Sequence, residues 1–215
     1  MKRSAPPGRR TPPGLILWIG LLAAALFGVT ACGFGGSSAG TPKAAAPASS
    51  AQPSSGASDT TVAGDIPDNQ VYVAFTPAAG GYVIKVPEGW SRTSAGSSVT
   101  FTDRFNGIRV ETQPAAKAPT NATAAGTEAA SLRSAVPGFS LGDVSTVHRS
   151  AGDAVLVKYR ATSPPEQVTG KTVQLSTERY EFWRGGVEAI VTLSAPAGAD
   201  NVDPWKTVTD SFGWR

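Results

Sequence analysis

The chain has very few of the residues on which protein chemistry most often depends. Its 215 residues include one cysteine and one histidine. A single cysteine cannot form an intramolecular disulfide, and together with one histidine it cannot supply the usual ligands of a zinc site. The Gly-x-Ser-x-Gly, Gly-x-Gly-x-x-Gly and phosphate-loop patterns are all missing. We therefore expect no metal, no cofactor and no catalytic motif.

The titratable side chains do not converge in the sequence either. Glu178 and Glu181 alternate to opposite faces of one predicted strand, so they do not form an acid–base pair. Asp200 and Asp203 suit the capping of a helix better than catalysis. His148, the only histidine, lies in a predicted strand, where an exposed or hydrogen-bonded role is commoner than that of a general base. A carboxylate-based hydrolase is thus the least favoured function.

Long apolar runs are also scarce. The one sizeable run covers residues 15–29, shorter than the roughly 20 residues that a membrane-spanning helix needs. Four basic residues and no acid precede it: Lys2, Arg3, Arg9 and Arg10. This arrangement predicts a secretory signal peptide over residues 1–31, with an uncleaved anchor helix as the less favoured alternative. The adjacent arginines leave two export routes open, the general one and the twin-arginine one.

The basic balance of the whole chain does not indicate nucleic-acid binding. The pI is about 9.2, but cleavage after residue 31 removes four of the 19 Lys and Arg residues and none of the 16 Asp and Glu. The remaining chain carries a net charge of −1. It lacks the electrostatic footprint that a nucleic-acid partner requires.

The end of the apolar run resembles the lipobox of bacterial lipoproteins. Val29, Thr30 and Ala31 are an aliphatic residue and two small ones, and they precede Cys32. The resemblance implies cleavage before Cys32 and a lipid attached to its thiol. That lipid is a diacylglyceryl group, and the resemblance allows a further acyl group on the new N-terminus. Two or more acyl chains anchor a protein stably where one is marginal. We expect a cell-membrane protein, lipid-anchored on the extracytoplasmic face.

Residues 32–70 read as a disordered tether between this anchor and a folded domain. Ala, Ser, Gly, Pro and Thr make up 28 of the 37 residues from 33 to 69. Such a segment buries too little apolar area to offset the entropy of ordering it. The single folded domain is expected at residues 71–215, long enough to form a core without disulfides.

The domain shows strand patterns interrupted by two helical ones. Alternating or β-rich runs predict strands at 71–75, 82–86, 99–103, 108–111, 144–149, 154–161, 172–183 and 187–195. Asn106-Gly107 predicts a hairpin turn within 104–107. A helix is expected over 123–136, with an apolar stripe of Ala125, Ala129, Leu132 and Val136. A last helix is expected to start at Asp203-Pro204, an N-cap residue followed by proline.

This order of elements predicts an α+β fold, one antiparallel β-sheet with helices packed on it. Residues 82–90, 191–196 and 205–212 resemble marker segments of the Mog1/PsbP-like fold, an α/β/α sandwich that actinobacterial lipoproteins of the LpqN type share. The resemblance covers residues 71–215. It implies the architecture, and it carries no binding site across to this chain.

The aromatic side chains supply the remaining functional candidates. Tyr180 and Phe182 share one face of a predicted strand, while Glu181 and Trp183 share the other. Core packing is the commoner role of such residues, but Trp183 and Trp90 are candidates for an exposed contact patch. Our leading hypothesis is a non-enzymatic envelope lipoprotein that binds a protein partner or acts as an accessory subunit. The alternative is a carrier of a lipid or small apolar ligand.

Overall fold

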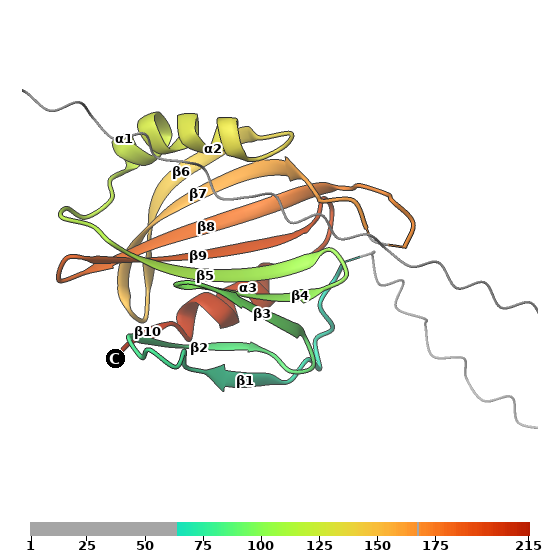
Figure 1. Cartoon of the computed structure of the whole chain (residues 1–215), viewed down its shortest axis with the longest axis horizontal. Helices are drawn as coiled ribbons and strands as arrows, with labels where there is room; N and C mark the ends of the chain where they lie inside the picture. The colour runs from blue at the N-terminus through green and yellow to red at the C-terminus, as the bar shows by residue number, and fades with distance from the viewer. Residues whose placement is uncertain (1–63, 167) are drawn as a thin grey trace, which may run out of the picture. The chain divides into compact units, whose positions relative to one another are not determined.

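The computed structural model describes residues 64–166 and 168–215 (Figure 1). The predicted signal peptide, the lipobox with Cys32, and most of the predicted tether lie outside these residues. The described residues belong to one compact unit of the chain. None of the helices in this part of the chain is long and apolar enough to cross a membrane.

A seven-stranded antiparallel sheet forms the centre of the domain, in the order β3-β4-β5-β9-β8-β7-β6. Its strands are β3 (Ser91–Ala95), β4 (Ser98–Asp103), β5 (Asn106–Pro114), β6 (Ser140–Arg149), β7 (Gly152–Thr162), β8 (Gln174–Arg184) and β9 (Val187–Pro196). Every neighbouring pair is antiparallel. The two strands adjacent to β8, namely β7 and β9, are joined to it over nearly their whole lengths.

A second sheet of three short strands lies beside the large one. It comprises β1 (Tyr72–Phe75), β2 (Tyr82–Pro87) and β10 (Gly213–Trp214), with β2 in the middle. In β2, Tyr82, Ile84 and Val86 are all buried, as the predicted alternation requires. The chain end thus returns to pair with an early strand, which fixes the last helix against the core.

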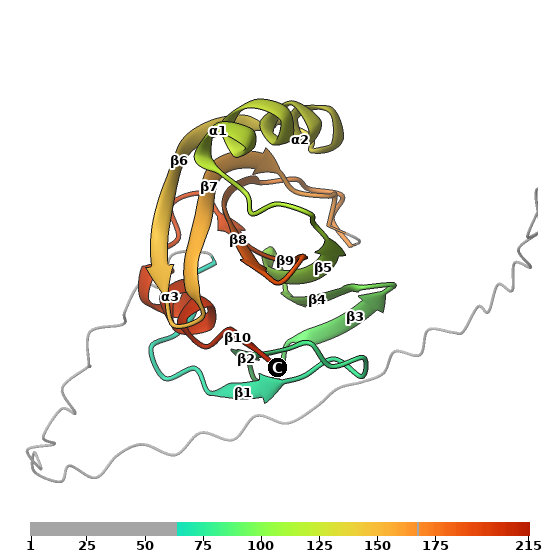
Figure 2. The same cartoon turned by 90° about the vertical axis from the view of Figure 1, so that its left-hand side faces the viewer.

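Helical segments cover both faces of the large sheet (Figure 2). One face carries a continuous helical stretch made of α1 (Asn121–Thr123), the π-helical turn η1 (Ala124–Glu128) and α2 (Ala129–Ala135). Thr120 and Thr123 form a reciprocal capping box at its start, which satisfies two backbone N–H groups. The other face carries α3 (Val202–Asp210) together with the small sheet.

Two apolar cores correspond to these two faces. The larger core joins the small sheet and α3 to the large sheet, with Phe182 and Phe212 stacked at 4.6 Å between ring centroids. The smaller core joins the helical stretch to β7, where Ala124 packs with Val155 and Val157. The predicted α+β class is therefore confirmed: an antiparallel sheet lies between helical layers, with a small second sheet beside α3.

Several local predictions need correction. The hairpin between β4 and β5 turns at Arg104-Phe105, because Asp103 pairs with Asn106 and places the Asn-Gly dipeptide in the strand. Arg104 adopts φ +50°, the left-handed conformation that the turn needs. Strands β3 and β10 were not predicted. All five residues of β3 are exposed, so it shows no apolar alternation.

The two helices also differ from their predicted details. Ala129, Leu132 and Val136 of the predicted stripe pack in the core, but at the π-helical turn Ala124 is buried in place of the predicted Ala125. The last helix begins one residue before Asp203, after Asn201, so Asp203 is not its N-cap. The Asn201 side chain instead accepts from the Ile66 N–H at 2.7 Å.

The contact between Asn201 and Ile66 places the start of the domain earlier than predicted. Ile66 is buried in the larger core, and Asn201 Nδ2 donates to the Gly64 carbonyl at 2.9 Å. Residues 64–70, which the sequence assigned to the tether, therefore pack on the domain. The predicted boundary at residue 71 lies several residues too late.

Candidate functional site

The candidate site lies on the face of β8 that looks toward the helical stretch. Alternation along β8 sends Tyr180 and Phe182 into the larger core and turns Arg179, Glu181 and Trp183 to the opposite face. This division between the two faces is the one predicted from sequence. It places the carboxyl of Glu181, the guanidinium of Arg179 and the partly exposed indole of Trp183 on one face of β8, beneath the helix.

Arg179 is the centre of a network of carboxylates on this face. Its Nε donates to Glu128 Oε1 at 2.8 Å and to Glu181 Oε1 at 3.0 Å, and its Nη2 also pairs with Glu128. Nη1 lies 3.5 Å from Glu111 Oε1, and Glu111 in turn pairs with Arg109 at 2.8 Å. One guanidinium thus connects β5, β8 and the helical stretch.

Glu181 is the most unusual titratable group of the network. Its side chain is fully buried, and its Oε2 atom has no hydrogen-bond partner. Burial, followed by the hydrogen bond and negative charge of Glu128, raises the pKa of Glu181 to about 8, although Arg179 acts in the opposite direction. The raised pKa favours the neutral form of the Glu181 carboxyl.

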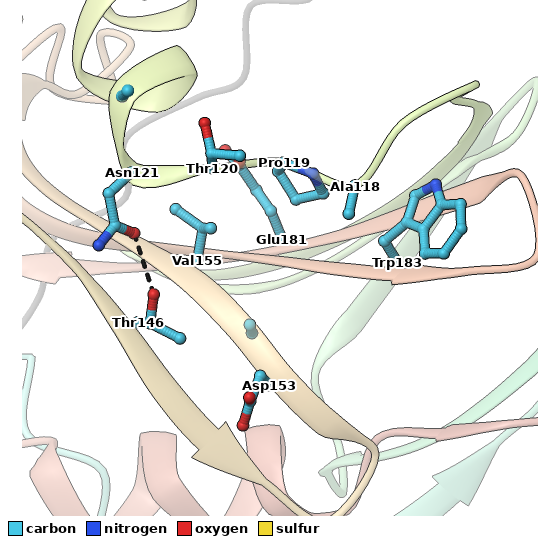
Figure 3. A pocket seen from close by; sticks show the side chains of 11 residues that line it. Ala118, Pro119, Thr120, Asn121, Thr146, Asp153, Val155, Glu181 and Trp183 are labelled. Atoms are coloured by element: carbon cyan, nitrogen blue, oxygen red, sulfur yellow. Dashed lines mark hydrogen bonds between the residues drawn. The ribbon is translucent and has the colours of Figure 1, made fainter.

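A hollow of about 510 Å³ opens beside this network (Figure 3). Glu181 and Val155 lie at its floor, and the segment that leads into the helix, from Ala118 to Asn121, forms one wall. Thr146 Oγ1 donates to Asn121 Oδ1 at 3.1 Å across one end. Trp183 closes the other end, where its Nε1 donates to the Ala115 carbonyl at 2.9 Å.

The two predicted contact residues are not brought together. Trp183 is 37% exposed at the hollow, whereas Trp90 is partly buried and packs against the larger core. Trp90 borders a different depression, which it shares with Val73 and Arg92. A single patch made of both indoles is therefore not present, and Trp183 is the stronger candidate.

The remaining titratable residues lie outside the network. His148 is exposed and pairs with Asp153 at 2.9 Å. Glu178 projects from the opposite face of β8, as predicted, and pairs with Lys158 at 2.8 Å. Within residues 64–166 and 168–215, no cluster of His, Cys, Asp and Glu could hold a metal ion. Cys32 and the lipobox residues Val29, Thr30 and Ala31 lie outside the described part.

The network around Arg179 was not predicted from the sequence. Its three carboxylates come from β5, the helical stretch and β8, which are far apart in the chain. One signal was available: Glu128 is four residues before Leu132 and adjacent to Ala129, so it falls on the apolar stripe of the predicted helix. A charged residue there needs a partner in the sheet, and Arg179 is that partner.

No family model matches the chain, and no curated protein matches it. The fold is similar to solved structures at low identity. A PsbP of Synechocystis sp. PCC 6803 shares 15% identity with a TM-score of 0.48, covering 71% of this chain and 98% of that one. LpqN of Mycobacterium tuberculosis, described as involved in cell envelope biogenesis, shares 14% with a TM-score of 0.41, covering 68% and 92%.

The Ran-binding protein Mog1p of Saccharomyces cerevisiae shares 10% identity with a TM-score of 0.43, covering 67% of this chain and 95% of that one. The chain also matches a protein of Bacteroides thetaiotaomicron, of which it spans about half the length, 48%. At these identities the likeness concerns the fold alone.

Proposed function

We propose that this chain is a non-enzymatic accessory lipoprotein of the cell envelope. Acylated Cys32 holds it on the extracytoplasmic face of the membrane, and the folded domain binds another envelope protein. The observation that carries the binding role is the state of Trp183. Its indole N–H donates to the Ala115 carbonyl, which holds the ring in one orientation while the residue stays 37% exposed.

A fixed, partly exposed tryptophan beside a hollow is the type of anchor on which protein interfaces depend. Trp is enriched among the residues that contribute most to binding energy, and such residues insert next to pockets. The chemistry around it supports binding more than catalysis. Arg179 pairs with all three carboxylates of the site, so these groups hold the helical stretch on the sheet.

Photo-crosslinking in native membranes tests the protein contact. We would place a photoreactive residue at Ala118, which is exposed at the rim of the hollow, and a control at Thr93 in the exposed strand β3. The expected result is one discrete protein adduct from position 118 and none from position 93. Trp183→Ala should remove the adduct. Equal adducts from both positions, or none from 118, would contradict the proposal.

The anchor needs a separate measurement. Cys32→Ala removes the only thiol of the chain, so the variant cannot carry a thioether lipid. We expect wild-type protein in the membrane fraction and the variant outside it, with the loss of mass that corresponds to the acyl groups. A variant that stays with the membrane as firmly as wild type would show that another feature anchors the chain.

A small apolar ligand is the second candidate for the same hollow. Its volume of about 510 Å³ exceeds the roughly 300 Å³ at which ligand pockets begin, and Pro119, Val155 and Trp183 give it apolar walls. Native mass spectrometry with oleate as the probe tests this role. A bound-oleate peak that Ala118→Trp abolishes would favour the carrier; no such peak in wild type would remove it.

A further inference from the structure

A second cavity lies on the face of the large sheet opposite to the hollow at Trp183. It has a volume of about 540 Å³, within the range of small-molecule sites. One wall is the segment from Phe75 to Tyr82, which joins β1 to β2, and the other wall comes from β3, β4 and β5. The cavity is therefore a gap between the two sheets, and the residues that line it are all different from those of the hollow.

The strand register brings the large-sheet residues of this cavity onto one face. Ser94 pairs with Val99, and Val99 pairs with Val110. Directly paired residues of antiparallel strands share a face. Arg92 and Thr112 lie two residues from Ser94 and Val110 on their own strands, so they share it too. This is the face of the larger core, in which Val99 and Val110 are buried.

The hydroxyl of Tyr82 is buried here without a hydrogen-bond partner among the described residues. Tyr82 is 2% exposed, and its ring centroid lies 6.5 Å from that of Phe75 and 5.8 Å from that of Phe212. Phe75 packs on Phe101 of β4, and Phe212 packs on Phe182 of β8. The Tyr82 ring therefore lies over the strands between them, at the inner end of the cavity.

Tyr180 provides the contrast within the same core. Its hydroxyl donates to Glu178 at 2.6 Å and accepts from Arg149 at 3.1 Å. A hydroxyl that is withdrawn from water and left unpaired lowers stability, and the domain avoids this cost at Tyr180 but not at Tyr82. Burial raises the pKa of Tyr82 to about 12, so its hydroxyl keeps its proton and can donate to an acceptor.

Arg92 supplies the only charge among the residues that line the cavity, and no Asp or Glu is among them. Its Cζ lies 5.5 Å from the centroid of the Phe75 ring. The guanidinium forms no hydrogen bond or ion pair with any described residue. Arg109, by comparison, pairs with Glu111 at 2.8 Å. The five N–H donors of Arg92 are thus available to a ligand.

The loop wall of the cavity is held in place by its own backbone. The Gly80 N–H donates to the Pro77 carbonyl at 2.8 Å, and the Arg215 N–H donates to the Gly81 carbonyl at 3.0 Å. Gly80 and Gly81 both have positive φ, at +73° and +92°, which glycine adopts without strain. The wall therefore has its shape before a ligand binds.

These features select one ligand class. A cation would be repelled by Arg92, since no carboxylate of the lining offsets its charge. A hydrocarbon would leave the Tyr82 hydroxyl unpaired. A polyanion would find a single cation, too few for the charge that it carries. A small organic anion fits, because guanidinium groups bind carboxylates strongly and the Phe75 ring offers an apolar surface.

We propose that this cavity binds a small carboxylate with a ring-sized apolar body, its charged group at Arg92 and a polar group at the Tyr82 hydroxyl. Phe75 contacts both residues, so one small molecule can reach from one to the other. The site does not depend on the protein contact proposed at Trp183. Its loss would therefore leave the crosslink at Ala118 unchanged.

Calorimetric titration of the full chain in detergent tests the proposal. The probes are para-hydroxybenzoate and para-hydroxyphenylacetate, with benzoate as the analogue that lacks the hydroxyl and para-hydroxybenzamide as the one that lacks the charge. We expect at least one hydroxylated carboxylate to bind, and each analogue to bind about three- to tenfold more weakly.

Two variants assign the contacts to their residues. Tyr82→Phe should weaken the hydroxylated carboxylates by about three- to tenfold and leave benzoate unchanged. Arg92→Met should weaken every carboxylate and leave para-hydroxybenzamide unchanged. Arg133→Met is the matched control, because Arg133 lies over the Phe139 ring at 5.7 Å but does not line the cavity. It should leave all affinities unchanged.

Denaturant unfolding of the tyrosine variants separates a ligand role from a structural one. Tyr82→Phe should not lower the midpoint, because the hydroxyl has no protein partner, whereas Tyr180→Phe should lower it and keep the affinity. The proposal is overturned if neither hydroxylated carboxylate binds, or if para-hydroxybenzamide binds as tightly as para-hydroxybenzoate. It is also overturned if Arg92→Met or Tyr82→Phe leaves affinity unchanged, if Arg133→Met weakens binding as much as Arg92→Met, or if Tyr82→Phe destabilises the fold as Tyr180→Phe does.

Discussion

Arg179 on β8 and Glu128 in the helical stretch above it form the ion pair that joins two layers of the domain, with Nε donating to Oε1 at 2.8 Å. The same Nε also donates to Glu181 at 3.0 Å. A single buried cation therefore serves carboxylates from the helix and the sheet, and this arrangement leads to two predictions.

Replacing the cation should destabilise the domain strongly. Arg179→Met removes the cation that Glu128 and Glu181 share and leaves Glu111 with Arg109 alone. Removing one partner of a buried pair typically costs about 3–5 kcal/mol, and we expect a loss of that order in denaturant unfolding. Arg109→Met is the matched control, because Arg109 is 51% exposed and exposed pairs contribute about 1 kcal/mol or less. Equal losses in the two variants would contradict the central role of Arg179.

The second prediction concerns pH. The pKa of Glu181 is about 8 in the folded chain and near its ordinary value of 4.5 when unfolded. The unfolded state therefore releases this proton first, so the contribution of Glu181 to the free energy of unfolding is fully present below pH 4.5. It falls as the pH rises toward 8. At about 1.4 kcal/mol per pKa unit, the change amounts to a few kcal/mol.

Glu181→Gln isolates this effect, because glutamine has nearly the same shape and does not titrate. The free energy of unfolding of the wild type, relative to that of the variant, should fall between pH 4.5 and pH 8. It should be constant above and below that window. A difference that stays the same from pH 4 to pH 9 would mean that Glu181 has an ordinary pKa.

The parts of the fold that could be predicted are those with a one-dimensional pattern. Tyr82, Ile84 and Val86 alternate and are buried together, because a strand with one covered face must place its apolar residues two apart. Strand β3 has no such signal, since it is a polar edge strand held only by β4. The β4–β5 turn was misplaced because pairing along the strands outweighed the preference of Asn-Gly for a turn.

The site is less visible in the sequence than the fold. Trp183 could be identified as a candidate because the faces of β8 follow from alternation. The separation of Trp183 from Trp90 could not be predicted, because it depends on how the two sheets pack. The Arg179 network depends on register, since Glu111 of β5 and Glu181 of β8 both pair with Ile190 of β9. Register between strands distant in sequence is set by tertiary packing, which no local pattern records.

The turn after the helical stretch gives a third prediction. Gly138 has φ +66°, and a Cβ there would lie 2.2 Å from Thr162 Oγ1 and 3.2 Å from its backbone N. Gly185 has a similar φ of +59° with open space around it. Gly185→Ala should therefore cost only the backbone strain, about 1 kcal/mol. Gly138→Ala should cost about 1–3 kcal/mol more, because the added methyl also collides with β7.

Equilibrium unfolding of both glycine variants checks this difference. The extra cost at Gly138 should shrink in the Gly138→Ala, Thr162→Ala double variant, because the nearest colliding atom is then absent. If the two single variants lose the same stability, the close approach of the turn to Thr162 has no energetic effect.

The last prediction compares two adjacent residues of β6, Arg149 and His148. Arg149 ties three elements together: its Nε donates to Thr209 in α3 at 2.9 Å, and its guanidinium lies over the Tyr180 ring of β8 at 5.1 Å. Lysine has one charged nitrogen and cannot reproduce the fork or the stacking. We expect Arg149→Lys to lower the free energy of unfolding by about 2 kcal/mol.

His148→Ala should stay within about 0.5 kcal/mol of wild type, because both His148 and Asp153 are exposed and such pairs contribute little. Denaturant unfolding of the two variants under one condition checks the contrast. The same His148 variant also tests the least favoured function. If His148→Ala abolished an activity that wild type shows, the exposed pair would be a catalytic one. The binding role requires instead that the variant leave the crosslink at Ala118 unchanged.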